Sequence, residues 1–391
     1  MTPYFRLTRA ALPAGMLALL LSQQAGAVEF KMGTTTASVY GFAKLDLIYD
    51  VDNDLGDLAA RPRILIDGQR GSDGHFTMHP YQSRLGFKTQ TPVEGSPLVT
   101  RVEIDWMDNP PEGGDLRLRH AYGSWNDVLA GKTWTNFGSR LSRTPIIDFA
   151  PSPGQSKSGR KAQLRYSWNG FHVALENPDP DDFKDSVAAK FNPARGGYAP
   201  HPDAKQEVPD ITLRYQAASE RLAYSAAAVA RRLSVEADGT GIDDSTTGWG
   251  LSTAARLQAT ERLALRGALT YGDGIGEYLQ NNPSAPAFVN GDSINTISAW
   301  GANLGMSLAV GPGAINLGYG ISRADVDDLR NAGLAGAEGA NEQFQAVHLN
   351  YIWSPAKRIS YGMEMGYHTR DVADGRDGNA LRLQGMVKYA F

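Results

Sequence analysis

Hydrophobic and polar residues alternate at every second position through much of this chain. In the segment Asn379–Phe391 (NALRLQGMVKYAF) the odd positions from Leu381 onward are apolar apart from one glycine, and the even positions include Arg382 and Lys388. Alternate side chains of a strand point to opposite faces. One apolar face and one cationic face therefore predict a strand that separates an oily phase from water.

About sixteen segments show this period of two. They cover 37–50, 81–90, 98–106, 116–122, 129–137, 161–168, 171–177, 210–217, 222–231, 248–258, 263–271, 296–309, 314–322, 343–353, 358–368 and 379–391. In the first of them Leu45, Leu47 and Tyr49 share one face, and Lys44 and Asp46 share the other. The fold class predicted is all-β.

The connections between these segments alternate in length. Short turns are expected at 126–128, 169–170, 218–221, 260–262, 311–313 and 354–357, and long loops at 51–78, 138–160, 178–209, 232–247, 272–295, 323–342 and 369–378. Asn169-Gly170 is a strong signal for a two-residue hairpin. Strict alternation of short and long connections is typical of an up-and-down barrel whose long loops all lie at one end.

The first 27 residues have the three parts of a signal peptide. Arg6 and Arg9 precede an apolar stretch, Ala10–Leu21, and the small residues Ala25-Gly26-Ala27 follow it. This predicts export and removal of residues 1–27, which leaves 28–391 as a single barrel domain. No later window contains the roughly eighteen apolar residues that a membrane helix needs, so membrane residence requires a closed barrel.

Composition narrows the candidate chemistry. The chain has no cysteine, which excludes disulfides and thiolate metal sites, and its net charge of -4 is close to neutral. Aromatic residues fall near the expected strand ends, as interfacial girdles require. They are Trp106, Trp168, Trp249, Trp300, Trp353 and Tyr389.

Charges are distributed unevenly between the two faces of the expected strands. The face expected to line the lumen carries Lys44, Arg84, Lys88, Arg101, Arg117, Arg119, Lys132, Lys161, Arg165, Arg214, Arg256, Arg266, Arg382 and Lys388. The acids on this face are mainly Asp46, Glu103, Asp105, Glu176 and Glu364. Other acids gather in the outer loops, at Asp52, Asp54, Asp57, Asp179, Asp181, Asp182 and Asp185. One wall should be basic, whereas the segments from 296 to 322 offer Asn303, Ser307, Asn316 and Ser322 and should be neutral.

Several motifs resemble those of Gram-negative trimeric porins, and most of all the DcaP-like dicarboxylate porins. They are Tyr40–Asp50 (YGFAKLDLIYD), Ser83–Thr89 (SRLGFKT), Leu116–Trp125 (LRLRHAYGSW), Gly131–Phe137 (GKTWTNF) and the final Lys-Tyr-Ala-Phe. The resemblance implies a 16-stranded antiparallel transmembrane β-barrel with long extracellular loops, an inward-folded third loop and a homotrimeric assembly in the outer membrane. DcaP-like members can carry a helical extension before the barrel, whereas here about ten residues separate Val28 from the first strand.

The charge pattern predicts a channel for small anionic solutes. If loop three folds inward, its cations Arg140, Arg143, Lys157 and Arg160, with the single acid Asp148, meet the basic wall. The planar fork of arginine binds a carboxylate bidentately and stays charged at any working pH. Dicarboxylates are the expected solutes, because a dianion can meet two arginines across a gap. The residues expected to line the pore are Lys44, Arg84, Lys88, Arg101, Arg117, Arg119, Arg140, Arg143, Arg160, Arg165 and Arg382.

Three other functions remain open. A general nonspecific porin would also have arginines that simply solvate a water-filled lumen. A barrel enzyme of the lipase or protease type needs a nucleophile and a base in contact, but Ser124 and His120, four residues apart in a strand, are separated by roughly 13 Å. A plugged structural barrel would need acids from the plug to match the lumen cations. The favoured prediction is a channel without enzymatic activity.

No cofactor, metal or nucleic acid is expected, and the partners expected are anionic solutes, outer-membrane lipid and lipopolysaccharide. Gly131-Lys132-Thr133 lacks the upstream glycine of a phosphate loop, and GDGIG at 272–276 lacks the acidic partner of a dinucleotide site. The seven histidines show no metal spacing. In the acidic loop Asp50–Gly56 the glycine falls one place late for a calcium loop, so a divalent cation there is an open alternative to a solvated loop.

Overall fold

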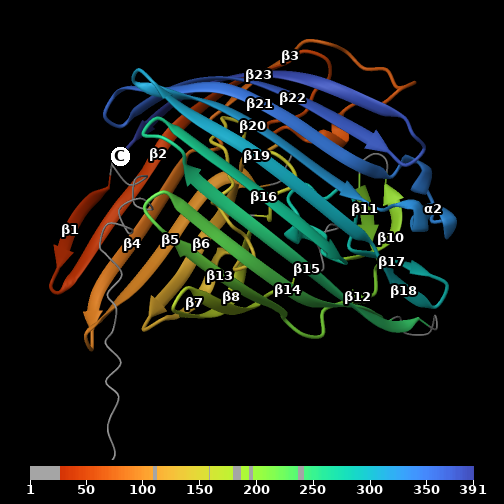
Figure 1. The fold of residues 1–391 in the computed structure, drawn as a ribbon, viewed down its shortest axis with the longest axis horizontal. Coiled ribbons are helices and arrows are strands. Elements are labelled where there is room, and N and C mark those ends of the chain that lie inside the picture. The colour runs from red at the N-terminus through yellow and green to blue at the C-terminus, as the bar shows by residue number, and fades with distance from the viewer. Residues whose placement is uncertain (1–26, 109–111, 158, 179–185, 193–196, 237–241) are drawn as a thin grey trace, which may run out of the picture.

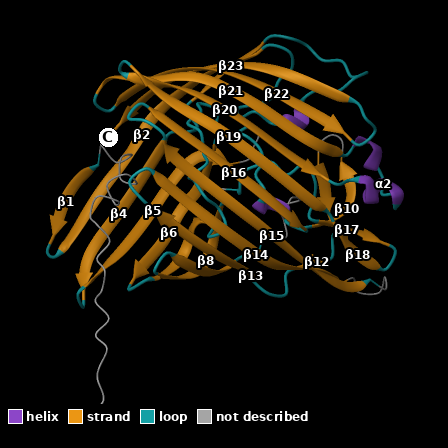
Figure 2. Ribbon diagram, viewed as in Figure 1, coloured by secondary structure: helices purple, strands orange, loops and turns teal. Residues whose placement is uncertain are grey.

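The computed structural model describes residues 27–391 apart from 109–111, 158, 179–185, 193–196 and 237–241. The predicted signal peptide therefore lies outside the described residues, except for Ala27. Antiparallel strands run obliquely around a closed barrel, and the short helix α2 (Asp327–Asn331) lies at one end (Figures 1 and 2). Within the described residues, no helix is long and apolar enough to cross a membrane.

Sixteen strands form the closed wall, and each predicted period-two segment corresponds to one of them. They are β2 (Thr35–Asp50), β4 (Arg84–Val93), β5 (Ser96–Asp108), β6 (Asp115–Trp125), β7 (Val128–Trp134), β8 (Arg160–Trp168), β9 (Phe171–Glu176), β13 (Asp210–Ala218), β14 (Leu222–Glu236), β15 (Asp243–Gln258), β16 (Leu263–Asp273), β19 (Ser298–Val310), β20 (Gly313–Ala324), β21 (Asn341–Ala356), β22 (Ile359–Val372) and β23 (Asp377–Ala390). Pairing of β2 with β23, from Phe42↔Ala390 to Asp50↔Arg382, closes the barrel.

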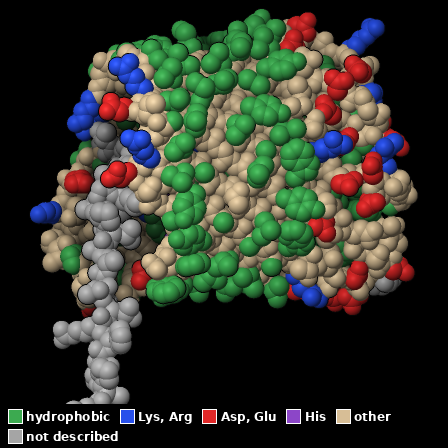
Figure 3. All heavy atoms as spheres, viewed as in Figure 1, with side chains coloured by type: hydrophobic (Ala, Val, Ile, Leu, Met, Phe, Trp, Pro, Cys, Tyr) green, Lys and Arg blue, Asp and Glu red, His purple; other side chains and the backbone are tan. Residues whose placement is uncertain are grey.

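The two faces of the wall separate as the alternation predicts. In β23 the odd residues Leu383 and Tyr389 are 44% and 52% exposed, whereas Arg382 and Gln384 are 2% and 4% exposed. Hydrophobic side chains cover the middle of the outer surface, and charged ones gather toward its two sides (Figure 3). Such an apolar band between charged rims is the surface that a lipid bilayer requires.

The barrel has a short-turn end and a long-loop end. At the short-turn end, Asn169 and Gly170 both have positive φ (46° and 83°), as the two central residues of a type I′ hairpin must. Asn126 and Asp127, with φ of 49° and 70°, form an equivalent two-residue turn. Both turns lie where the sequence predicts a short connection.

Two of the predicted long loops are wrong. The hairpin of β14 and β15 continues to Glu236↔Asp243, so most of 232–247 is strand, and β22 and β23 extend to Asp371↔Asp377, so most of 369–378 is strand as well. In the β14 extension, Leu233 and Val235 are 1% and 0% exposed and pack in a cluster with Val187, Ala287 and Ile294 of the loops. Residues distant in the sequence therefore cover this face in place of lipid, and a search for lipid-facing strands misses it.

The loops contain further short elements that the pattern also misses. They are β1 (Val28–Met32), β3 (His75–His79), β10 (Val187–Asn192), β11 (Gly197–Pro200), β12 (Ala204–Lys205), β17 (Ala287–Asn290), β18 (Ser293–Thr296), α2 (Asp327–Asn331), and the 3-10 turns η1 (Arg61–Arg63), η2 (Gly276–Tyr278) and η3 (Ala337–Gly339). Strands β11, β10, β17 and β18 form a small separate sheet at the long-loop end. It shares an apolar cluster with α2 and η3, in which Phe288 and Leu329 are fully buried.

Candidate pore constriction

Loop three, residues 135–159 between β7 and β8, lies inside the barrel. It follows the inner wall and takes hydrogen bonds from one strand after another. Side-chain donors on the wall reach its backbone carbonyls: Arg214 of β13 to Gly138 (3.0 Å), Arg266 of β16 to Arg143 (2.9 Å), Asn303 of β19 to Ser142 (2.8 Å) and Asn350 of β21 to Pro145 (2.9 Å). The predicted inward fold of loop three is confirmed.

The carboxylate of Glu364 on β22 anchors the middle of loop three. It accepts the backbone N–H groups of Ile147 at 2.8 Å and Asp148 at 2.9 Å, and Asn350 donates to it at 2.7 Å. Glu364 is only 6% exposed. The acid therefore holds a loop and does not face the open lumen.

Loop three approaches the wall so closely at Gly154 that no side chain would fit. Its φ is +89°, and a Cβ there would lie 2.1 Å from the Ile321 carbonyl oxygen and 2.4 Å from that of Ala302. On its other side lies loop six, residues 274–297: Gly154 donates to Gln280 at 3.0 Å, and Lys157 donates to Tyr278 at 2.8 Å. Two loops therefore fill this part of the lumen, and the sequence predicts only one of them.

Arg382 lies at the junction of loops one and three. Its guanidinium donates to Asp50 (2.7 and 2.8 Å), to Asp148 of loop three (3.0 Å) and to the Gly56 carbonyl of loop one, residues 51–83 (2.6 Å). Burial favours a raised pKa for Asp148, but the charge of Arg382 outweighs it and holds this pKa below its ordinary value. All sides of the Arg382 fork are occupied by the protein.

Lys44 has a similar environment. Its ammonium pairs with Asp46 at 2.8 Å and donates to Gln82 at 2.8 Å and to the Ile147 carbonyl of loop three at 3.0 Å. The side chain is 7% exposed. Like Arg382, Lys44 is positioned to hold loop three in place.

The wall predicted to be neutral contacts loops three and six. Asn303 and Ser322 are 3% and 0% exposed, and Ser322 donates to the Asn281 carbonyl of loop six at 2.6 Å. Asn316 donates to Asn350 at 2.8 Å, and Ser307 donates to Asn316 at 2.5 Å. Neutral amides and hydroxyls suit this role because they satisfy loop backbone groups without burying charge.

The opposite wall, from β4 to β8, carries the arginine ladder. Arg117 forms a bidentate pair with Asp105 (3.0 and 2.9 Å), and Arg119 bridges Asp105 and Glu103 (2.7 Å to Glu103). Arg84 and Arg101 also pair with Glu103, at 3.4 and 2.5 Å. Four guanidiniums thus share two carboxylates, and the ladder keeps an excess of positive charge. Lys88 extends the row toward the short-turn end, beside Arg101 in the β4–β5 register.

Four further arginines have no carboxylate within ion-pair distance in the part of the chain that the structure describes. They are Arg140 and Arg143 of loop three and Arg160 and Arg165 of β8. Burial and then the charges of Arg140 and Arg119 lower the pKa of Arg143 to about 10, so Arg143 stays protonated at neutral pH. The guanidinium carbons of Arg160 and Arg119 both lie near the Trp134 indole, at 4.6 and 5.9 Å, which places Arg160 beside the ladder. The structure therefore brings loop-three cations and ladder cations together.

Trp134, at the end of β7, joins these cations, and the sequence analysis misses it. The guanidinium carbons of Arg160, Arg140 and Arg119 lie 4.6, 5.1 and 5.9 Å from centroids of its indole. Arg117 similarly lies 5.0 Å from the ring centroid of Phe149 in loop three. An aromatic residue at the base of the inward loop, followed by several arginines in the next turns of chain, is the signal that could have identified Trp134.

Lys132 is a correction to the predicted lumen face. Strand register pairs it with Ala121 of β6 and Ala162 of β8, and it shares its face with the exposed residues Ala130 and Val128. It therefore points to the outer surface. The prediction failed because the segment 129–137 contains Gly131 and several small residues, so its apolar alternation does not distinguish the faces.

The acidic loop uses its carboxylates on the protein itself. Asp50 binds Arg382, Asp52 accepts the Leu381 N–H at 2.8 Å, and Asp54 accepts the Gly56 N–H at 2.8 Å. No cluster of three potential metal ligands occurs among the described residues. The acids from Asp179 to Asp185 lie outside the described residues.

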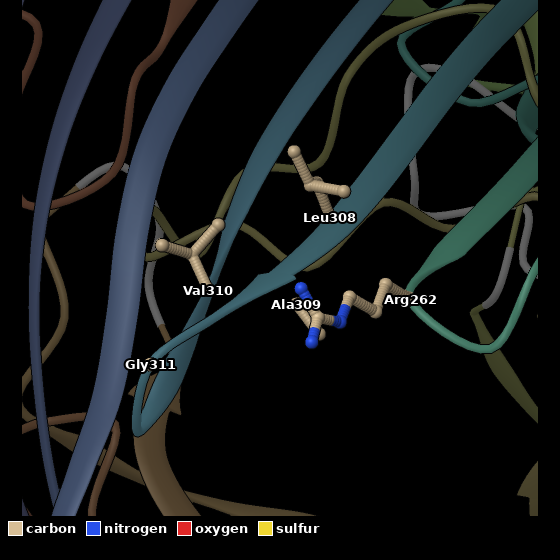
Figure 4. Close-up of a pocket in the computed structure, with 5 residues that line it drawn as sticks. All are labelled: Arg262, Leu308, Ala309, Val310 and Gly311. Carbon is tan, nitrogen blue, oxygen red and sulfur yellow. The ribbon is translucent and has the colours of Figure 1, made fainter.

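A shallow hollow at the short-turn end is separate from these groups. Arg262, Leu308, Ala309, Val310 and Gly311 line it, and the Arg262 side chain extends toward Ala309 (Figure 4). None of the cations predicted to line the pore borders it. The barrel interior is the relevant site.

Comparison with known proteins agrees with this architecture. No protein-family model and no curated protein sequence matches the chain. Among solved structures, the outer membrane channel DcaP of Acinetobacter baumannii is similar, with 25% identity, a TM-score of 0.79 and coverage of 93% of this chain and 99% of that chain. The anion-selective porin from Comamonas acidovorans has 13% identity, a TM-score of 0.57 and coverage of 91% and 100%. Salmonella typhi OmpF in complex with daunomycin has 12% identity, a TM-score of 0.55 and coverage of 93% and 100%.

The closed wall of sixteen strands, the apolar belt and the inward loop give the chain the fold of an outer-membrane β-barrel porin. Within that class it is similar to the DcaP channel over nearly its whole length, which confirms the resemblance that the strand motifs predict.

Proposed function

We propose that this chain is an anion-selective outer-membrane porin with a preference for small dicarboxylates. The observation that carries the proposal is a group of arginines, Arg140, Arg143, Arg160 and Arg165, that have no carboxylate partner among the described residues and lie beside a ladder with more cations than acids. Like charges confined between low-dielectric walls raise the local concentration of anions. A dicarboxylate can bind with one carboxylate to the arginines of loop three and with the other to the arginines of the wall.

The roles within the site differ from one cation to another. Arg140, Arg143, Arg160 and Arg165 are proposed to contact the solute, and Arg84, Lys88, Arg101, Arg117 and Arg119 to guide it. Arg382 and Lys44 are proposed to anchor loops, because carboxylates and backbone carbonyls already occupy their donors. Partial hydration keeps each contact weak enough for release, so passive diffusion needs no catalytic group.

The decisive experiment is a planar-bilayer recording of the purified protein under a salt gradient. The proposal predicts stable conductance, a reversal potential of anion-selective sign and block of the chloride current by succinate at lower concentration than by acetate. A cation-selective reversal potential would refute the charge argument. Equal block by succinate and acetate would support a nonspecific anion pore, and the absence of conductance would favour the plugged or enzymatic alternatives.

We also propose export through the N-terminal signal peptide and assembly as a homotrimer surrounded by lipid and lipopolysaccharide. One solved neighbour, OmpT of Vibrio cholerae, is described as a trimer form. The outer face of β2, β4 and β5 carries hydroxyl pairs, Thr35 with Thr91 (2.8 Å) and Thr89 with Thr100 (2.6 Å), and Lys132 lies on the outer face farther along the wall. Polar groups there suit contact with a second copy better than contact with lipid. The molar mass in detergent tests this assembly.

A further inference from the structure

Trp134 lies beside Arg140 and Arg160, two of the four arginines that have no carboxylate partner in the part of the chain that the structure describes. It is the last residue of β7, and loop three with Arg140 begins directly after it. In the pairing of β7 with β8, the residue opposite Trp134 is Arg160, the first residue of β8. The indole therefore lies between a cation of the inward loop and a cation of the wall.

The contacts of the ring differ from those of an ordinary packing residue. The guanidinium carbons of Arg160 and Arg140 lie 4.6 and 5.1 Å from the indole, and the ring of His120 meets it edge-on at 5.3 Å between centroids. Arg119, at 5.9 Å, already has Glu103 and Asp105 as partners. Neither Arg140 nor Arg160 forms an ion pair with a carboxylate in the described part of the chain.

An aromatic ring and a carboxylate hold an arginine with different consequences for a passing anion. A carboxylate neutralises the guanidinium and competes with the solute for its N–H donors. The face of an indole attracts a cation through its quadrupole, adds no net charge and leaves the edge of the guanidinium available to an acceptor. It also opposes the repulsion that would otherwise drive two unpaired guanidiniums apart.

We propose that Trp134 is a positioning residue of the constriction, which holds Arg140 and Arg160 toward the pore without neutralising them. This inference rests on the proposed anion selectivity of the channel. In this proposal the indole of Trp134 orders Arg140 and Arg160 and leaves their N–H donors free to bind an anion.

The test compares Trp134→Leu, Trp134→Phe and the outer-face control Trp168→Leu in bilayers. Trp168 is 63% exposed and contacts Phe171, away from the cations. For Trp134→Leu we expect the chloride-to-potassium permeability ratio to fall about threefold and the succinate concentration for half-block to rise about threefold, since the indole attraction is of order 0.5–1 kcal/mol. Trp134→Phe should retain most of the selectivity, and Trp168→Leu should retain all of it.

A double-mutant comparison separates positioning from general damage. In the Arg140→Gln/Arg160→Gln background, adding Trp134→Leu should change neither selectivity nor succinate block further. If Trp134→Leu keeps wild-type selectivity, or lowers it equally in both backgrounds, the inference is wrong while the proposed function stands. If the wild-type channel is not anion-selective, both are wrong. Should Trp134→Leu fail to fold, Trp134→Phe and Trp134→Tyr in the two backgrounds decide the question by the same criterion.

Discussion

The two halves of the inner wall use polar residues for opposite purposes. From β13 round to β23 and β2 many inward side chains bind the loops, as at Asn350, Glu364 and Arg382. From β4 to β8 the inward arginines outnumber their acids. A basic side chain on the lumen face is therefore not by itself a pore residue, because its neighbours decide whether it holds structure or meets solute.

Replacing Arg382 should have the largest effect and should be one of stability. Arg382→Met leaves Asp50 and Asp148 buried without their counter-charge, and breaking such a buried pair costs about 3–5 kcal/mol. The free energy of unfolding in detergent measures this loss. The matched control is Arg376→Met, whose exposed guanidinium pairs with Asp374 in water and should contribute little to stability. A variant Arg382→Met that is stable but has lost anion selectivity would show that Arg382 contacts the solute and does not serve mainly to anchor the loops.

Replacing Arg140, Arg143 and Arg160 together by Gln should have the converse result. None has a carboxylate partner among the described residues, so we expect unfolding stability to stay within about 1 kcal/mol of the wild type. Anion selectivity should fall about tenfold, equivalent to about 1.4 kcal/mol. Reversal potentials and thermal unfolding of the same preparation measure the two quantities. Arg262→Gln, at the short-turn end, removes a charge outside the constriction and should alter neither.

The smallest predicted effect compares the two faces of neighbouring strands. Arg165→Gln on the lumen face and Lys132→Gln on the outer face each remove one positive charge. Only Arg165→Gln should reduce the chloride-to-potassium permeability ratio, by about twofold, because the wall and its lipid or protein surroundings separate Lys132 from the conducting water. An equal reduction in both variants would show that Lys132 faces the lumen and that the strand register is misread.

The sequence by itself determined the wall. Alternation of period two located all sixteen strands, and it set the faces of Leu383 and Arg382 because a strand between oil and water must sort its side chains. It missed the β14–β15 extension, where residues of distant loops, and not lipid, cover the apolar side chains Leu233 and Val235.

Only the tertiary structure decided which cations remain unpaired. The partners of Arg382 come from Asp50 and Asp148, separated by nearly a hundred positions along the chain, and loop six reaches loop three across a comparable interval. No local pattern encodes such encounters, because they depend on where a closed barrel brings its loops. The same holds for Arg140 and Arg160: the fold places the indole of Trp134 beside them, whereas the carboxylates of the ladder pair with other arginines.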